Sequence, residues 1–304
     1  MDLFTFLESK KTPVGLTDLI VSLADACKLI AGELREAVDS EHVGTVNKSG
    51  EEQIAMDVRA DAIVGEHMRA CQYVAVLGGE EMADAEVVNP EGDYAVFCDP
   101  LDGSSLADVN FSVGTIAGIF EGKEVLGKTG RSLAAALYAV YGPKTTLVVT
   151  VKKGVHEFML VGGEWALIKE DFQVGEAKYF ACGNLRACPE RPDYLELVNK
   201  YIMNKYTLRY SGGMTPDINH ILHKGGGIFL YPGTPSQPDG KLRLLFECAP
   251  MSLIMEEAGG ASSNGLKPVL DVEIKNYEQR TPIFIGGKSE VVYALSITTP
   301  KHDR

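Results

Sequence analysis

The stretch VFCDPLDGSS, residues 96–105, places two aspartates three residues apart where an apolar run ends. Residues 94–98 are apolar and β-prone, which predicts a buried strand, and Pro100 prevents that strand from continuing. Asp99 and Asp102 therefore lie at a strand end, beside a glycine and two serines. Such a group is either an elaborate turn or a functional site, and the rest of the chain decides between them.

The same order of apolar strand and carboxylate recurs elsewhere. YVAVLGGEE, residues 73–81, and LRLLFE, residues 242–247, both read as strands that end in glutamate. A single acidic residue at such a place is usually solvated or caps a helix. Parallel sheets, however, gather their binding residues at the carboxyl ends of strands. We therefore expect one acidic cluster built from Glu80, Glu81, Asp99, Asp102 and Glu247, with Asp57 and Glu51 near the start of a helix.

Clustered carboxylate oxygens without nearby sulfur or imidazole suit hard divalent cations. Mg²⁺ in particular prefers a few carboxylates together with substrate phosphate oxygens. Gly103, Ser104 and Ser105 follow Asp102 at once and offer backbone N–H groups and hydroxyls to a phosphate. The pattern predicts phosphoryl transfer or phosphate hydrolysis.

Composition narrows the class of protein. The chain has 304 residues, 45% hydrophobic and 23% charged, which is ordinary for a globular protein with a full core. A net charge of −13 argues against a nucleic acid or an anionic membrane as partner. The apolar run Leu133–Tyr141 is shorter than the roughly 18 residues that span a bilayer. With no signal-peptide pattern at the N-terminus, we expect a cytoplasmic location.

Periodicity predicts the order of the elements. Helices are expected at 16–38, 53–70, 132–142, 192–205 and 250–260, and strands at 73–79, 94–98, 111–120, 145–169, 226–232 and 242–247. After about residue 175 helices and strands alternate, so we place a subdomain boundary near residue 178.

A rival motif is present at Gly122–Thr129, which matches the nucleotide-binding P-loop pattern G-x-x-x-x-G-K-[ST]. Lys123 and Glu124 would have to coexist with packed phosphates, and Gly130 weakens the first turn of the helix that should follow. No later apolar strand ends in the aspartate that such a site needs for Mg²⁺. We therefore favour a glycine-containing hairpin turn over a P-loop.

The motifs together resemble the fructose-1,6-bisphosphatase type of magnesium-dependent, lithium-sensitive sugar phosphatases, and the resemblance covers nearly the whole chain. It rests on CDPLDGSS, the preceding GGEE, KLRLLFECAP and EEAGG, in the family's order. CGNLRA, KYTLRYSGGMTPDINHIL and Leu106 after DGSS are more similar to the sedoheptulose-1,7-bisphosphatases than to the fructose-1,6-bisphosphatases. Tyr231 in FLYP is more typical of the fructose enzymes, so the resemblance leaves both sugars open.

The resemblance implies an α/β fold, a layered α-β-α-β-α sandwich with two subdomains. Residues 1–178 would bind metal and residues 179–304 the sugar phosphate. The implied metal ligands are Glu80, Glu81, Asp99, the carbonyl of Leu101, Asp102 and Glu247, while Asp57 and Glu51, with Glu81, would be catalytic and handle the attacking water. Gly103, Ser104 and Ser105 would hold the phosphate that is cleaved, and Asn184, Arg209, Tyr210, Gly212, Met214, Tyr231 and Lys241 would hold the sugar and the far phosphate.

The implied activity is hydrolysis of the C1 phosphate of a sugar bisphosphate, with sedoheptulose 1,7-bisphosphate preferred. Roughly two or three Mg²⁺ ions per site would assist. The resemblance also implies a homo-oligomer, a dimer rather than a tetramer, in which Arg209 reaches the neighbouring subunit's site. A fructose-specific or dual-specificity enzyme is the first alternative, and a non-catalytic sugar-phosphate sensor is the second.

Overall fold

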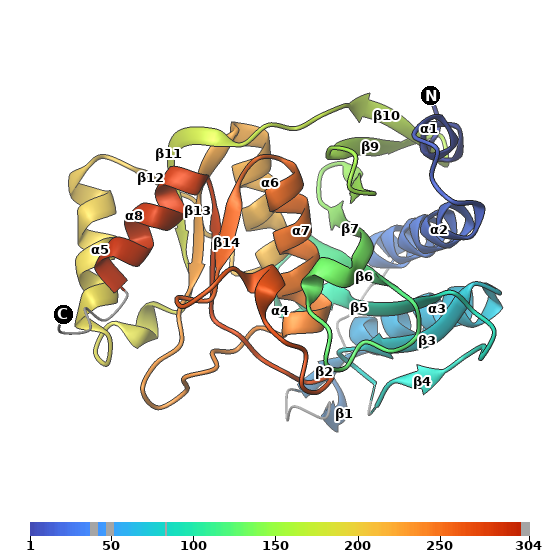
Figure 1. Ribbon diagram of the computed structural model, residues 1–304, viewed down its shortest axis with the longest axis horizontal. Helices are drawn as coiled ribbons and strands as arrows, with labels where there is room; N and C mark the ends of the chain where they lie inside the picture. The colour runs from blue at the N-terminus through green and yellow to red at the C-terminus, as the bar shows by residue number, and fades with distance from the viewer. Residues whose placement is uncertain (37–41, 47–51, 83, 299–304) are drawn as a thin grey trace.

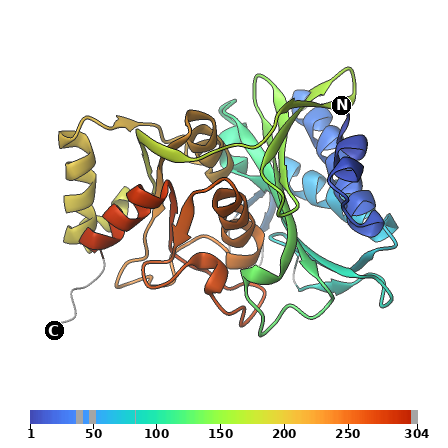
Figure 2. The same cartoon turned by 45° about the horizontal axis from the view of Figure 1, so that its top comes forward.

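Two large β-sheets and three groups of helices alternate in five layers, as Figures 1 and 2 show. The computed structural model describes residues 1–36, 42–46, 52–82 and 84–298. The layered α/β architecture predicted from the sequence is confirmed.

The first sheet has eight strands in the order β10-β9-β8-β7-β6-β5-β3-β4. Their bounds are β3 Val74–Gly79, β4 Glu86–Val87, β5 Tyr94–Asp102, β6 Val113–Glu121, β7 Leu133–Tyr141, β8 Thr145–Thr150, β9 His156–Val161 and β10 Glu164–Lys169. Its outer face is covered by α1 (Leu3–Ser9), α2 (Val14–Glu36) and α3 (Ala55–Ala70). Helix α2 buries apolar residues at three- and four-residue intervals against this sheet, as its periodicity predicts.

The second sheet has five strands in the order β12-β11-β13-β15-β14. Their bounds are β11 Gly175–Cys182, β12 Thr207–Leu208, β13 Gly226–Tyr231, β14 Ala261–Ser263 and β15 Ile283–Gly286. Helices α6 (Met214–Lys224) and α7 (Ala249–Glu257) fill the layer between the sheets, and α5 (Pro192–Met203) and α8 (Lys288–Thr298) cover the outer face. Residue 178 lies inside β11, and the division of the chain there stays a prediction.

The remaining elements are short. Strands β1 (His42–Val46) and β2 (Glu52–Ile54) pair with each other, α4 is Ser104–Ala107, and 3₁₀ turns occur at Gly130–Ser132, Leu185–Ala187 and Val269–Asp271. No helix in the part of the chain that the structure describes has the length and apolarity of a membrane span.

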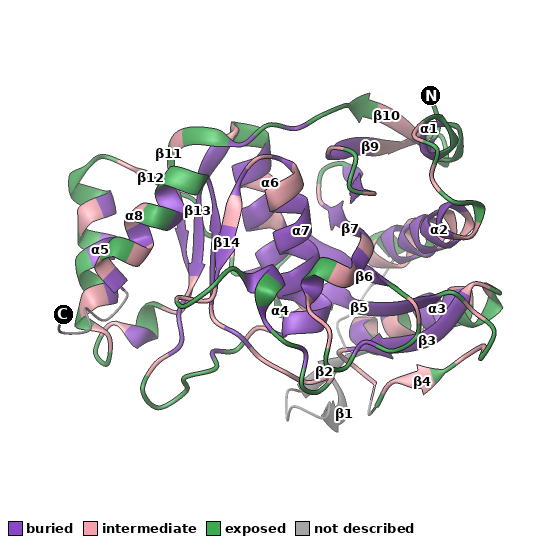
Figure 3. Cartoon of the chain, viewed as in Figure 1, coloured by how far each residue is buried: buried purple, intermediate pink, exposed green. Residues whose placement is uncertain are grey.

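The helix predicted at 132–142 is wrong, because these residues form strand β7. The segment is apolar at almost every position, so no periodicity separates helix from strand. In the structure its side chains alternate between two cores: Ala136 and Tyr138 face the middle helices, whereas Leu137 and Ala139 face the outer ones. Because both faces of the strand are buried, it has no polar positions that would alternate with the apolar ones and indicate a strand. Figure 3 shows β7 as buried, between helix layers.

The P-loop reading is excluded by the same region. Gly122–Thr129 lies in the connection between β6 and β7, which pair antiparallel, and a short 3₁₀ turn leads directly into β7. A P-loop needs a helix at this point to hold its lysine and threonine.

Candidate active site

Glu80, which follows β3, lies near Asp99 in β5 because these two strands are parallel neighbours. Gly79 lies opposite Cys98, so Glu80 and Asp99 lie at the same level along the two strands. The Glu80 N–H donates to the Cys98 carbonyl at 3.2 Å. The rule that parallel strand ends gather functional groups therefore holds for this pair, although most of the sheet is antiparallel.

The prediction that Pro100 ends the strand is wrong, because β5 continues through Pro100 to Asp102. A bulge in this part of β5 accommodates the proline and explains the three-residue spacing of the aspartates. Asp99 lies opposite Ile116 and Asp102 opposite Gly114, so β5 advances three residues while β6 advances two. Because side chains alternate along a strand, the extra residue turns both aspartates to the same face. The hydroxyl of Thr115 donates to the Pro100 carbonyl at 2.8 Å and holds the bulge.

Glu247 reaches the site from a π-helical turn, Leu244–Cys248, that leads into α7. The strand predicted at 242–247 is therefore wrong. The apolar run is β-prone, but all five residues of the turn are buried, and the Cys248 N–H donates to the Arg243 carbonyl five residues earlier. The widened turn lets the Glu247 carboxylate accept the Arg243 N–H at 2.6 Å.

Helix α6 approaches the acidic cluster with its N-terminal end. The approach is close because position 114 in β6 is glycine: a Cβ there would lie 2.4 Å from Thr215 and 2.5 Å from the Ala139 carbonyl. The N–H groups of Met214 and Thr215 donate to the Asp102 carboxylate at 3.3 and 2.6 Å. Asp102 is thus held by a helix from the other half of the chain.

Three carboxylates form the centre of the cluster. Asp99, Asp102 and Glu247 are at most 6% exposed, and one oxygen from each lies within 4.8 Å of the others. Burial, with the charges of Glu80, Asp102 and Glu247, raises the pKa of Asp99 well above its usual range. Burial and neighbouring carboxylates do the same to the pKa of Glu247. Oxygen donors that repel one another fit a divalent cation.

Arg243 is a site residue that sequence reasoning missed. Its side chain is 1% exposed, and its guanidinium lies 3.5 Å from Glu80 and 3.6 Å from Glu278. It also donates to the Lys241 carbonyl at 3.1 Å. Its place in KLRLLFE, four residues before Glu247, was the only signal in the sequence.

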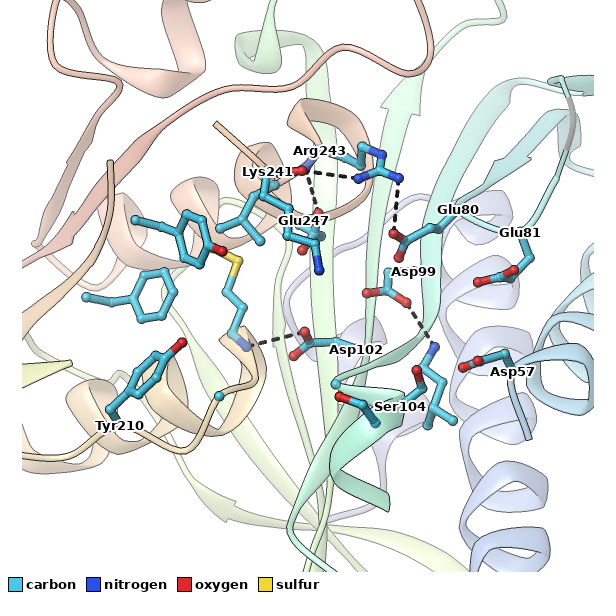
Figure 4. A pocket seen from close by; sticks show the side chains of 18 residues that line it. Asp57, Glu80, Glu81, Asp99, Asp102, Ser104, Tyr210, Lys241, Arg243 and Glu247 are labelled. Carbon is cyan, nitrogen blue, oxygen red and sulfur yellow. Dashed lines mark hydrogen bonds and ion pairs between the residues drawn. The ribbon is translucent and has the colours of Figure 1, made fainter. Parts of the chain in front are cut away.

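The carboxylates line one side of a cavity of about 450 Å³, within the usual size of a small-molecule site. In Figure 4 Asp57 and Glu81 lie on one side of the acidic centre, and Tyr210 lies on the opposite side. The predicted residues that line the cavity are Asp57, Glu80, Glu81, Asp99, Leu101, Asp102, Gly103, Ser104, Ser105, Tyr210, Gly212, Met214, Tyr231, Lys241 and Glu247; Phe229, Leu242 and Arg243 were not predicted.

Two predicted residues do not line this cavity. Asn184 donates its side-chain N–H to the Pro232 carbonyl at 3.1 Å, next to Tyr231. Arg209 is exposed, and its guanidinium donates to the Leu208 carbonyl. Glu51 lies outside the described residues.

Comparison with known proteins finds matches along the chain. Residues 5–170 match the family model "Fructose-1-6-bisphosphatase, N-terminal domain", and residues 174–299 match the corresponding C-terminal domain. The chloroplastic sedoheptulose-1,7-bisphosphatase of Spinacia oleracea is 42% identical over 94% of this chain and 75% of its own length. The class 1 fructose-1,6-bisphosphatase of Syntrophotalea carbinolica is also 42% identical, over 98% of this chain and 93% of its own length. The crystal structure of Leishmania major fructose-1,6-bisphosphatase in holo form aligns with a TM-score of 0.93 and 31% identity over 98% of both chains.

Proposed function

Because the chain belongs to the fructose-1,6-bisphosphatase family, we propose that it hydrolyses the C1 phosphate of a sugar bisphosphate, with sedoheptulose 1,7-bisphosphate preferred. It is then a phosphoric monoester hydrolase. The observation that carries the proposal is one cavity with buried carboxylates on one side and two tyrosines and a lysine among its other lining residues.

The donor set fits Mg²⁺. The converging groups are carboxylate oxygens, and burial together with their mutual repulsion raises the pKa values of Asp99 and Glu247, a situation that a bound cation would relieve. Glu80, Glu81, Asp99, the Leu101 carbonyl, Asp102 and Glu247 are the proposed ligands of roughly two or three ions. Bound Mg²⁺ would supply neutralisation of the phosphate charge and a lower pKa for the attacking water.

The protein's own groups have separate roles in this proposal. Asp57, 5% exposed in the first turn of α3, orients the attacking water and accepts its proton, together with Glu81 and Glu51. Ser104 and Ser105, with the Gly103 backbone, hold the phosphate that leaves the sugar. The bulge in β5 and the N–H groups of α6 keep Asp102 in position during the reaction.

The lining residues of the cavity other than the acids form a substrate-binding wall, which would bind the rest of the substrate. It includes Tyr210, Tyr231 and Lys241, and the Lys241 ammonium, whose charge acts on Asp102, suits a phosphate or a sugar hydroxyl. Gly212 and Met214 contribute from the turn before α6, and Asn184 supports the position of Tyr231. We further propose a cytoplasmic homo-oligomer, a dimer rather than a tetramer, in which Arg209 serves the neighbouring site.

One assay tests the activity and the choice of sugar. Phosphate release is measured from sedoheptulose 1,7-bisphosphate and from fructose 1,6-bisphosphate, side by side, with Mg²⁺ and with a chelator. We expect Mg²⁺-dependent release from both, with the higher kcat/KM for the seven-carbon substrate. The fructose alternative has support of its own, since relatives of both names are equally similar. Release from neither substrate would refute the proposed function.

A further inference from the structure

The turn Ser211–Gly213 connects two residues of the substrate-binding wall, Tyr210 and Met214, next to the acidic cluster. Tyr210 precedes it, Met214 follows it as the first residue of α6, and both line the cavity together with Gly212. The position of this turn therefore determines how far the wall lies from Asp102.

A buried carboxylate holds the turn from the protein interior. Asp217, one helical turn into α6, is 4% exposed, and its Oδ1 accepts the Ser211 N–H at 2.8 Å. Its Oδ2 has no hydrogen-bond partner among the described residues. Burial raises the pKa of Asp217 to about 7. Burying this carboxylate with one oxygen unpaired is therefore unfavourable for stability. Asp217 does not line the cavity.

Two further contacts define the position of the turn. At its end, Met214 and Thr215 donate their N–H groups to Asp102. On another side lies Leu106, whose methyl groups would be 3.2–3.3 Å from a Cβ at Gly212 or Gly213. Any side chain at Gly212 would also be strained by its φ of +110°. The turn thus packs closely on Leu106 and is tied by hydrogen bonds at both ends.

We propose that Asp217 is a positioning residue for substrate binding, which holds the Ser211–Gly213 turn so that Tyr210, Gly212 and Met214 face the metal-binding carboxylates. The inference rests on the proposed function for its substrate, a sugar bisphosphate. It assigns Asp217 no contact with the substrate or with a metal.

Kinetics of two variants test the proposal. Asp217→Ala removes the acceptor for the Ser211 N–H, and we expect KM for the bisphosphate to rise about tenfold while kcat changes by less than about threefold. Asp217→Asn keeps an acceptor oxygen of the same reach, and we expect both constants within about threefold of the wild-type values. An unchanged KM in Asp217→Ala, or a loss confined to kcat, would overturn the proposal.

A matched control separates positioning from general stability. Glu290 in α8 is also a buried carboxylate: it is 7% exposed, accepts the Tyr206 hydroxyl at 2.8 Å and has one oxygen without a hydrogen-bond partner among the described residues. It does not line the cavity. Glu290→Ala should lower Tm as Asp217→Ala does and leave KM unchanged. An equal rise in KM in both variants would show that lost stability, rather than the turn, is responsible.

Amide hydrogen exchange tests the tether without any activity. In the full chain without substrate, Asp217→Ala should speed exchange in the peptide that spans Tyr210–Met214, whereas Glu290→Ala should not. Unchanged exchange in the Tyr210–Met214 peptide would refute the proposal that Asp217 holds the turn, even if the enzyme were active. If the wild type cleaves neither bisphosphate but exchange responds as expected, the proposed function fails and the tether stands.

Discussion

The two sides of the cavity are built in different ways. The acidic side comes largely from two short motifs, GGEE at the end of β3 and CDPLDG at the end of β5, which lie side by side because the strands are parallel neighbours. The substrate-binding wall comes from separate elements, namely the turn before α6, the end of β13 and the loop before the π-helical turn. The acidic centre is buried, whereas Tyr210 is 45% exposed. Local sequence therefore specifies the acidic groups of the site. The packing of the two halves of the chain against each other specifies the shape of the substrate-binding wall.

The largest effect is expected on the acidic side. Asp102→Asn or Glu81→Gln should lower kcat by at least about 100-fold, the scale of losing an electrostatic stabiliser, because each removes the charge of a proposed metal ligand. Phosphate release under saturating substrate and Mg²⁺ measures it, with Tm recorded for each variant. Asp108→Asn, an exposed aspartate six residues beyond Asp102, is the control and should be unaffected. Near-normal turnover in either test variant would remove that residue from the site.

A smaller effect, on binding alone, is expected at Arg209, which does not line the cavity of its own chain. Arg209→Ala should raise KM about tenfold with little change in kcat, because a permanently charged guanidinium suits the far phosphate. Arg186→Ala, also exposed and outside the cavity, is the matched control.

Mixing variants shows which subunit Arg209 serves. Arg209→Ala chains are combined with Asp102→Asn chains. If the sites are shared, a hybrid dimer has one site with both lesions and one intact site, so turnover at low substrate reappears. If Arg209 serves its own chain, every site keeps one lesion and nothing is recovered. A strictly monomeric enzyme would also rule out sharing.

The stability of the metal-free protein should depend on pH because of the acidic side. Asp99 and Glu247 have raised pKa values in the folded protein, against ordinary values of 3.8 and 4.5. Above those ordinary values the unfolded chain has lost its protons while the folded one still holds them, so stability falls as pH rises. Without divalent ions, Tm should drop by at least about 3 °C between about pH 5 and pH 8.

Mg²⁺ provides the contrast for this measurement. At the proposed site Mg²⁺ would take over the role of the bound protons, so saturating Mg²⁺ should flatten the dependence of Tm on pH. Asp99→Asn should also flatten the dependence of Tm on pH without Mg²⁺, because an amide cannot titrate. Equal slopes with and without Mg²⁺ in the wild type would contradict the assignment of these carboxylates as ligands.

The smallest effect is expected at the rejected P-loop. Lys128 donates to the Glu121 carbonyl in the β6–β7 connection and does not line the cavity. Lys128→Ala should change kcat/KM by less than about twofold, as most surface substitutions do. Calorimetric titration of ATP into wild type and variant should give no Lys128-dependent binding. A large fall in kcat/KM in Lys128→Ala, or ATP binding that the variant loses, would support a nucleotide-binding loop after all.

The sequence by itself determined the amphipathic helices and the acidic side of the site. Helix α2 was predictable because its apolar residues repeat at helical spacing. The aspartates of CDPLDG could be found because they directly follow an apolar, β-prone run and stand beside Gly103 and two serines. The bulge that carries the strand through Pro100 could not be predicted, because it depends on the pairing with β6.

Only the tertiary structure decided β7, the π-helical turn and the arrangement of the wall. β7 is uniformly apolar, so its conformation depends on the two cores that cover it. Arg243 and Asp217 have no motif of their own that predicts burial. The role of Arg243 depends on Glu80, far away in the chain, and that of Asp217 on Ser211 in the loop before α6. The physical reason is the same throughout: backbone strain and periodicity act over a few residues, whereas burial and charge are set by whatever the folded chain brings alongside.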